Sequence, residues 1–131
     1  MTAKERAKDT RLKREYHITL EEHKAVFKYQ GGVCAICKKI LSKKNVPLIL
    51  AVDHSHTHPA IVRGLLCWPC NKALAYFQDS VDKLKAAVAY LEHPPFTVVL
   101  GEPRLTAPGR IGSKARAKLL KKMKLMETDG N

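Results

Sequence analysis

Long apolar runs are missing from this 131-residue sequence. The longest, VPLILAV at residues 46–52, is far shorter than the roughly 20 residues with which a helix crosses a bilayer. The N-terminal stretch MTAKERAKDTRLKRE is charged throughout and has no apolar segment of the kind that a secretory signal needs. We therefore expect a soluble, intracellular protein with no membrane partner.

Acidic residues are also scarce, with 12 Asp and Glu against 24 Lys and Arg, and the formal net charge is +12. The excess is +3 in residues 1–30 (8 basic, 5 acidic), +4 in 31–100 (8 and 4) and +5 in 101–131 (8 and 3). Such a charge favours a polyanionic partner, and nucleic acid is the commonest. An acidic membrane surface, or solubility alone, would also suit a basic chain.

Only four cysteines occur, and they form two Cys-x-x-Cys pairs, Cys34 with Cys37 and Cys67 with Cys70, separated by 29 residues. In a reducing compartment two structural disulfides are rare. Four thiolates can instead surround zinc tetrahedrally at ~2.3 Å, and a complete shell leaves no position open for catalysis. The spacing predicts a structural zinc site, with iron or a redox dithiol as alternatives.

The local patterns predict a small α+β fold, with room for one compact domain plus tails. Residues 1–16 are polar and suit a frayed basic helix or a disordered arm. A helix is expected over 20–29, because TLEE has a capping-box pattern and two glycines follow the helix. The apolar runs over 47–53 and 60–66 are expected to form strands.

The C-terminal half predicts more helices. One is expected over 71–77 with Asn71 as its cap, and SVDKLKAAVAYLEH carries apolar residues at helical spacing. Four of the seven prolines lie within 94–109, so we expect a linker there, with a short strand at TVVL. Residues 110–131 are expected to form a basic amphipathic C-terminal helix.

The stretch VDHSHTHP, at residues 52–59, gathers polar side chains where the first predicted strand ends. Zinc binding would hold this strand end near Asn71, so Asp53 and Asn71 could bind a hard divalent cation through oxygen. His54 could be neutral and accept a proton from an attacking water. The alternative is a solvated polar loop.

One geometric condition follows from this interpretation. Neighbours on a regular strand point to opposite faces, so the strand must bend or end between Asp53 and His54. His56 comes two positions after His54 and could share its face, as a phosphate contact or as a second base.

These parts, in this order, resemble the HNH, or ββα-metal (His-Me finger), nucleases, and more narrowly the phage recombination endonuclease VII family. The matching stretches are TLEE, QGGVCAIC, VDHSH and VRGLLCWPCNKAL, within roughly residues 16–92. The resemblance implies a zinc-stabilised ββα-metal core over 17–93 with flanking helices, preceded by a basic arm (1–16) and followed by the linker (94–109) and the basic tail.

The resemblance also implies roles for individual residues. The four cysteines would hold zinc, Asp53 and Asn71 a catalytic Mg²⁺ or Mn²⁺, while His54 would be the general base and His56 an accessory histidine. The best-known family member has a glutamate where this chain has Leu74, so the catalytic shell here has one carboxylate fewer. The family further implies a phage-encoded homodimer that cuts branched DNA in the host cytoplasm.

The leading hypothesis is a metal-dependent DNA endonuclease that resolves branched DNA such as Holliday junctions in phage recombination or packaging. The alternatives are an HNH enzyme that nicks ordinary duplex, and a zinc-stabilised DNA-binding module without catalysis. Trp68 is expected to pack on the core, with stacking on a base as the alternative. The candidate phosphate contacts, each of which could also be ordinary solvated surface, are Arg63, Lys72, Arg110, Lys114, Arg116, Lys118, Lys121 and Lys122.

Overall fold

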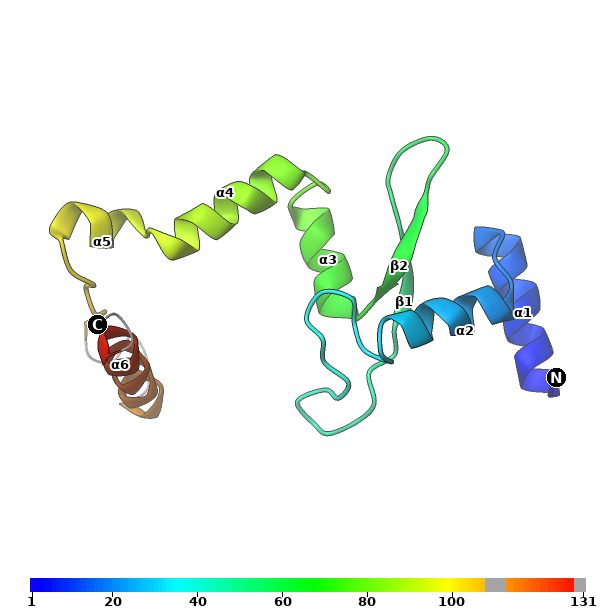
Figure 1. The fold of residues 1–131 in the computed structure, drawn as a ribbon, viewed down its shortest axis with the longest axis horizontal. Helices are drawn as coiled ribbons and strands as arrows, with labels where there is room; N and C mark the ends of the chain where they lie inside the picture. The colour runs from blue at the N-terminus through cyan, green and yellow to red at the C-terminus, as the bar shows by residue number, and fades with distance from the viewer. Residues whose placement is uncertain (108–112, 129–131) are drawn as a thin grey trace. The chain divides into compact units, whose positions relative to one another are not determined.

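The computed structural model describes residues 1–107 and 113–128, and it confirms the small α+β class. Six helices and two strands are found there (Figure 1). In chain order they are α1 (Ala3–Tyr16), α2 (Leu20–Tyr29), β1 (Ala51–His54), β2 (Val62–Leu66), α3 (Trp68–Tyr76), α4 (Val81–Glu92), α5 (Pro95–Leu100) and α6 (Ser113–Thr128).

Two compact units divide the chain, Met1–Leu84 and Lys85–Asn131, and the division falls within α4. The first unit holds α1, α2, the two-stranded sheet and α3, and it contains every residue predicted for catalysis or zinc binding. The predicted boundaries at 16/17, 93/94 and 109/110 stay predictions. Among the described residues, no helix is both long and apolar enough to cross a membrane.

Of the two alternatives for the N-terminus, the helix is found, and it packs on α2. A capping box of Thr2 and Glu5 begins α1, and Leu12 is buried, with 1% of its surface exposed. The buried Asp9 carboxylate accepts the N–H of Leu20 at 2.8 Å, and Lys13 approaches it at 2.6 Å. The hydrogen bonds from Lys13 and Leu20 lower the pKa of Asp9. A side chain of α1 thus satisfies a free N–H in the first turn of α2.

Helix α2 has the predicted bounds, and its end is tied to the sheet. Its capping box is formed, and Gly31 and Gly32 follow it with φ of 71° and 74°, the region that glycine adopts most readily. The Gln30 amide then bonds to β2: Nε2 donates to the Leu65 carbonyl and Oε1 accepts the Leu65 N–H, both at 2.9 Å. Gln30 therefore takes the place of a strand partner at the edge of β2.

Strands β1 and β2 pair antiparallel, with an irregularity at the predicted place. Asp53 pairs with Gly64 but His54 pairs with Val62, so Arg63 is an additional residue on β2. Strand β1 is shorter than the predicted run over 47–53, because the Leu48 N–H donates to the Ile40 carbonyl of the preceding loop. The extra residue lies on β2, and Asp53 and His54 do not face one point: Asp53 is buried, whereas His54 is exposed.

Two predictions about the C-terminal half are wrong. Asn71 does not cap α3: the helix begins earlier, with Cys67 as N-cap, and Pro69 fits this early position because its missing N–H is not needed there. TVVL is not a strand but part of α5, which starts at a proline and ends at Gly101, with φ 74°. The predicted helix over SVDKLKAAVAYLEH is found as α4, and α6 lies within the predicted basic tail.

Candidate functional site

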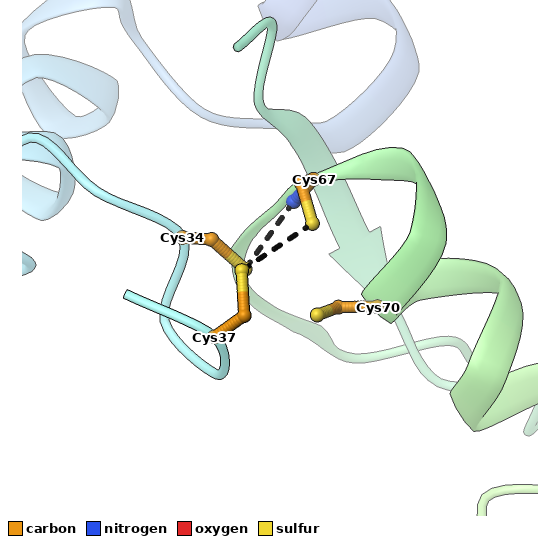
Figure 2. Close-up of side chains that lie close together, drawn as sticks. All are labelled: Cys34, Cys37, Cys67 and Cys70. Atoms are coloured by element: carbon orange, nitrogen blue, oxygen red, sulfur yellow. Dashed lines mark hydrogen bonds between the residues drawn. The ribbon is translucent and has the colours of Figure 1, made fainter. Parts of the chain in front are cut away.

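The four cysteines come together in the first unit. Cys34 and Cys37 lie in the loop after α2, Cys67 at the junction of β2 and α3, and Cys70 in the first turn of α3 (Figure 2). Their sulfur atoms all lie within 4.8 Å of one another, and none forms a disulfide. The Sγ atoms of Cys37 and Cys67 are 3.7 Å apart, close to the ~3.8 Å edge of a tetrahedron with zinc–sulfur bonds of ~2.3 Å. The cluster could therefore hold a structural zinc ion.

The electrostatics of the cluster also suit a cation. Burial raises the pKa of Cys34, but N–H groups outweigh it, including that of Cys67 at 3.4 Å, and the net pKa is lowered to about 6. Burial raises the pKa of Cys67, and it raises that of Cys70 to about 12. The protein alone thus favours the thiolate of Cys34, whereas the positive charge of a metal would favour deprotonation of Cys67 and Cys70.

Asp53 is buried, with 4% of its surface exposed, and both of its carboxylate oxygens are bonded to Arg63. The guanidinium donates from Nε to Oδ2 at 2.7 Å and from Nη2 to Oδ1 at 3.1 Å. These bonds raise the already high pKa of Arg63. Because Arg63 is the additional residue of the bulge, the local irregularity brings the two side chains together.

A second carboxylate, Asp79, extends this arrangement to the histidine loop. Arg63 Nη2 donates to Asp79 Oδ1 at 3.1 Å, and Nδ1 of His56 lies 2.7 Å from Asp79 Oδ2. The hydrogen bonds from His56 and then Arg63 lower the pKa of Asp79. We call these four side chains, Asp53, Arg63, Asp79 and His56, the acid–base network. The sequence contains no signal for Asp79, which is 16 residues from Arg63 and 23 from His56.

The turn after α3 places Asp79. Gln78 and Asp79 both have positive φ, 56° and 54°, which non-glycine residues adopt uncommonly. The N–H of Asp79 donates to the Leu74 carbonyl at 2.9 Å and that of Gln78 to the Ala75 carbonyl at 2.9 Å, the pairing of a Schellman motif. The end of α3 therefore fixes the backbone that carries the second carboxylate.

His54 is exposed at the end of β1, and its ring has one nitrogen available. Its Nδ1 lies 3.1 Å from the Ser55 carbonyl oxygen, which can only accept, so this bond forms when Nδ1 carries the proton. In the neutral ring Nε2 then has a free lone pair. The ring centroid lies 5.7 Å from that of His56 and 6.3 Å from that of Tyr16, a neighbour from α1 that sequence reasoning missed.

The predicted catalytic residues are only partly brought together. Asp53 lines a cavity of about 300 Å³ with Arg63, Asp79 and Leu74. His54 lines a different cavity, of about 310 Å³, together with Tyr16. The structure does not join Asn71 to Asp53: its N–H donates to the Cys67 carbonyl at 3.0 Å, and its side chain bonds to no residue of the acid–base network.

The predicted phosphate contacts differ in their surroundings. Arg63 is engaged with two carboxylates, whereas Lys72 is exposed and its Nζ lies over the Trp68 ring. Trp68 is 67% exposed, so the expectation that it packs on the core is wrong. Arg110 lies outside the described residues, and only the backbone of Arg116 is described, as part of α6. The remaining candidates are exposed on α6: Lys114, Lys118, Lys121 and Lys122.

Comparisons with known proteins agree with these features. The model of the recombination endonuclease VII family matches residues 9–93. A Gene 59 protein of Mycobacterium phage D29 is 43% identical over 95 residues, which cover 72% of this chain and 55% of that protein. A Gene 59 protein of Mycobacterium phage L5 is 42% identical over 95 residues, covering 72% and 56%. No solved structure matches.

The fold and the site define a small α+β protein with a candidate zinc centre at the junction of β2 and α3, and with aspartate and histidine at the end of β1. The chain belongs to the recombination endonuclease VII family. It spans little more than half the length of the phage relatives that it matches.

Proposed function

We propose that the protein is a metal-dependent DNA endonuclease of the HNH type, with β1, β2 and α3 as its ββα-metal core. The observation that carries this proposal is the pairing at the end of β1, where His54 has a free Nε2 and the neighbouring His56 is bonded to a carboxylate. The family and the net charge of +12 support DNA as the substrate.

The chain's own groups divide the chemistry between them. His54 accepts the proton of the attacking water through Nε2, because its Nδ1–H is already bonded to the Ser55 carbonyl. His56 is oriented by Asp79 and serves as a phosphate contact or as a second base. The four cysteines hold zinc with a closed shell, which supports the strand and helix that carry the site.

Asp53 and Asn71 would hold a catalytic Mg²⁺ or Mn²⁺, since both offer the oxygen ligands that hard cations prefer. When bound, such an ion would stabilise charge on the phosphate and on the leaving oxygen. The site already accommodates a positive charge, because the Arg63 guanidinium contacts both Asp53 oxygens. Asp53 would hold the ion through an oxygen that now accepts from Arg63, and Asp79 offers the guanidinium a second carboxylate.

The finer role that we propose is resolution of branched DNA, such as Holliday junctions, in phage recombination or packaging, by a homodimer in the host cytoplasm. The family name and the mycobacteriophage relatives support it. A second candidate is a zinc-stabilised DNA-binding module without catalysis. It is favoured by the occupation of both Asp53 carboxylate oxygens by Arg63.

Cleavage of a labelled four-way junction, beside a linear duplex of matched sequence and with Mg²⁺ present, tests the proposal. We expect paired cuts at the junction, and a loss of at least 100-fold in His54→Ala, because general bases contribute about 10²- to 10⁴-fold. DNA affinity and zinc content should be unchanged. His93→Ala, an exposed histidine of the second unit, is the matched control and should cleave normally.

The other outcomes separate the candidates. Equal nicking of junction and duplex by the wild type would indicate an HNH enzyme for ordinary duplex. Turnover retained by His54→Ala would remove His54 as the base. Tight DNA binding with no cleavage under any divalent ion would favour the binding module.

A further inference from the structure

Helix α3 exposes two aromatic rings with a lysine between them. Trp68, Lys72 and Tyr76 are spaced four residues apart and therefore lie along one side of the helix. Trp68 is 67% exposed and Tyr76 is 77% exposed. The Lys72 Nζ lies 4.6 Å from the centroid of Trp68 and 5.9 Å from that of Tyr76. We call these three side chains the aromatic face of α3.

The position of this face follows from the attachment of the helix. Trp68 lies between Cys67 and Cys70, which belong to the cysteine cluster, and Leu74 packs against the same core on the other side of α3. The first turn of the helix is therefore fixed on its inner side, and Trp68 is directed to solvent. Its exposure is a consequence of the fold rather than of a loose side chain.

The charge of the face is of one sign. Helix α3 contains no acidic residue, so Lys72 is its only charged side chain, in a chain of net charge +12. Aromatic rings stack on the faces of nucleotide bases, and a cation near them attracts the phosphates that link those bases. Two exposed rings with an ammonium group between them thus have the composition of a nucleotide-binding surface.

We infer that the aromatic face of α3 binds unpaired nucleotides of DNA, with Trp68 and Tyr76 stacking on bases and Lys72 contacting a phosphate. In a duplex the base faces are covered by neighbouring base pairs, so this surface distinguishes single-stranded segments from paired ones. The two rings are separated by about 12 Å along the helix axis, at ~1.5 Å per residue. That distance corresponds to a few nucleotides, since successive phosphates of one strand advance by ~3.4 Å in a duplex.

This inference rests on the proposed function for its substrate, DNA, and adds the structural class of that substrate. Flexible junction points and unpaired ends of branched DNA present base faces that an ordinary duplex does not. The surface would therefore favour branched substrates without contributing to the chemical step.

Trp68 is the single tryptophan of the chain, so its fluorescence reports on this surface alone. The full-length protein would be titrated, without added divalent ion, with an eight-nucleotide oligo(dT) and with a blunt duplex at equal phosphate concentration. We expect saturable quenching of Trp68 by oligo(dT) and little change with the duplex. Tyr76→Ala, which keeps the reporter, should weaken oligo(dT) binding roughly 5- to 100-fold.

Two further variants sharpen the test. Lys72→Gln should reduce the slope of log K against log salt by about 0.7, the contribution of one phosphate contact on a single strand. Tyr29→Ala is the matched control, because Tyr29 is also an exposed tyrosine but lies on α2, and it should bind oligo(dT) as the wild type does.

The inference is overturned if oligo(dT) leaves Trp68 emission unchanged, or if Tyr76→Ala binds with wild-type affinity. It is also overturned if the emission depends on protein concentration and not on DNA, since a second copy would then cover the face. Quenching without any cleavage activity would contradict only the proposed nuclease. Cleavage without quenching would contradict only the aromatic face.

Discussion

Arg63 lies between two carboxylates, and its guanidinium is suited to that position. Its planar group carries five N–H donors in a fixed arrangement, so Nε and Nη2 can bond to Asp53 while Nη2 also contacts Asp79. A lysine could not make this bidentate contact. The bulge in β2 supplies the backbone position, and the turn after α3 supplies the second carboxylate.

The substitution Asp79→Asn removes the charge of the second carboxylate that Arg63 contacts. Because the folded state lowers the pKa of Asp79 below its usual 3.8, its stabilising effect is complete above pH ~4 and is lost as the pH falls through the folded pKa. The variant should be about 1 kcal/mol less stable than the wild type at pH 7, a value reduced by the exposure of His56 and Arg63. The difference should shrink as the pH falls below about 4.

Urea unfolding at pH 7 and at the lowest pH at which the cysteine cluster keeps its metal measures this difference. Glu102→Gln, which removes an exposed carboxylate of the second unit, is the control and should leave the urea midpoint nearly unchanged at both values. A difference between wild type and Asp79→Asn that is the same at both pH values would show that the carboxylate's charge does not stabilise the fold.

Among the elements, the cysteine-bearing loop and the start of α3 depend most on a metal. The first unit has few fully buried apolar side chains, and two of its buried residues, Cys34 and Cys67, belong to the cysteine cluster. The cluster joins the loop after α2 to the start of α3. Helix α3 in turn contacts β1, and the Gln30 side chain bonds the end of α2 to β2. A metal at this point would hold all of them together.

Removing zinc should therefore unfold the first unit. Structural zinc contributes ~10 to 16 kcal/mol in zinc-finger peptides, as much as the whole stability of a typical domain, ~5 to 15 kcal/mol. We expect a strong chelator to abolish the cooperative thermal transition seen by circular dichroism. Cys37→Ser should lose the metal as well, whereas Ile36→Ser, at the adjacent exposed position, should retain it. A cooperative melt that is insensitive to the chelator would argue against the four-cysteine zinc site.

At the scale of the whole molecule, positive charge extends through both units. Seven basic and no acidic residues lie between Arg110 and Met126, and the described lysines of α6 are exposed. Phosphate contacts of this kind release counterions, so each one that forms makes DNA binding more dependent on salt.

Deletion of residues 110–131 should weaken duplex binding and flatten its salt dependence. Each lost contact should change the slope of log K against log salt by about 0.9. Replacing Lys118, Lys121 and Lys122 by Gln gives a milder version without shortening the chain, and should change the slope by at most about 2.7. Measuring DNA affinity between 50 and 200 mM salt gives the slope for the deletion and the slope for the triple Gln variant. A slope unaltered by the deletion would show that the tail does not contact phosphates.

The sequence by itself determined the features that arise from short-range patterns. The Thr19 capping box and the glycines after α2 predicted the bounds of that helix, because capping involves residues three positions apart. The periodicity of α4 was equally local. The two Cys-x-x-Cys pairs predicted a four-cysteine cluster, since identical short pairs bring thiolates to one point. The motifs also indicated the endonuclease VII family.

Only the tertiary structure decided which side chains meet across long stretches of chain. The acid–base network joins β1, β2, the histidine loop and the turn after α3, and Gln30 bonds to Leu65, 35 residues away. Such contacts depend on strand register and on the bulge at Arg63, and neither can be read from local spacing. The fold likewise decided that Trp68 faces solvent, because the attachment of α3 through its cysteines outweighs the general tendency of tryptophan to be buried.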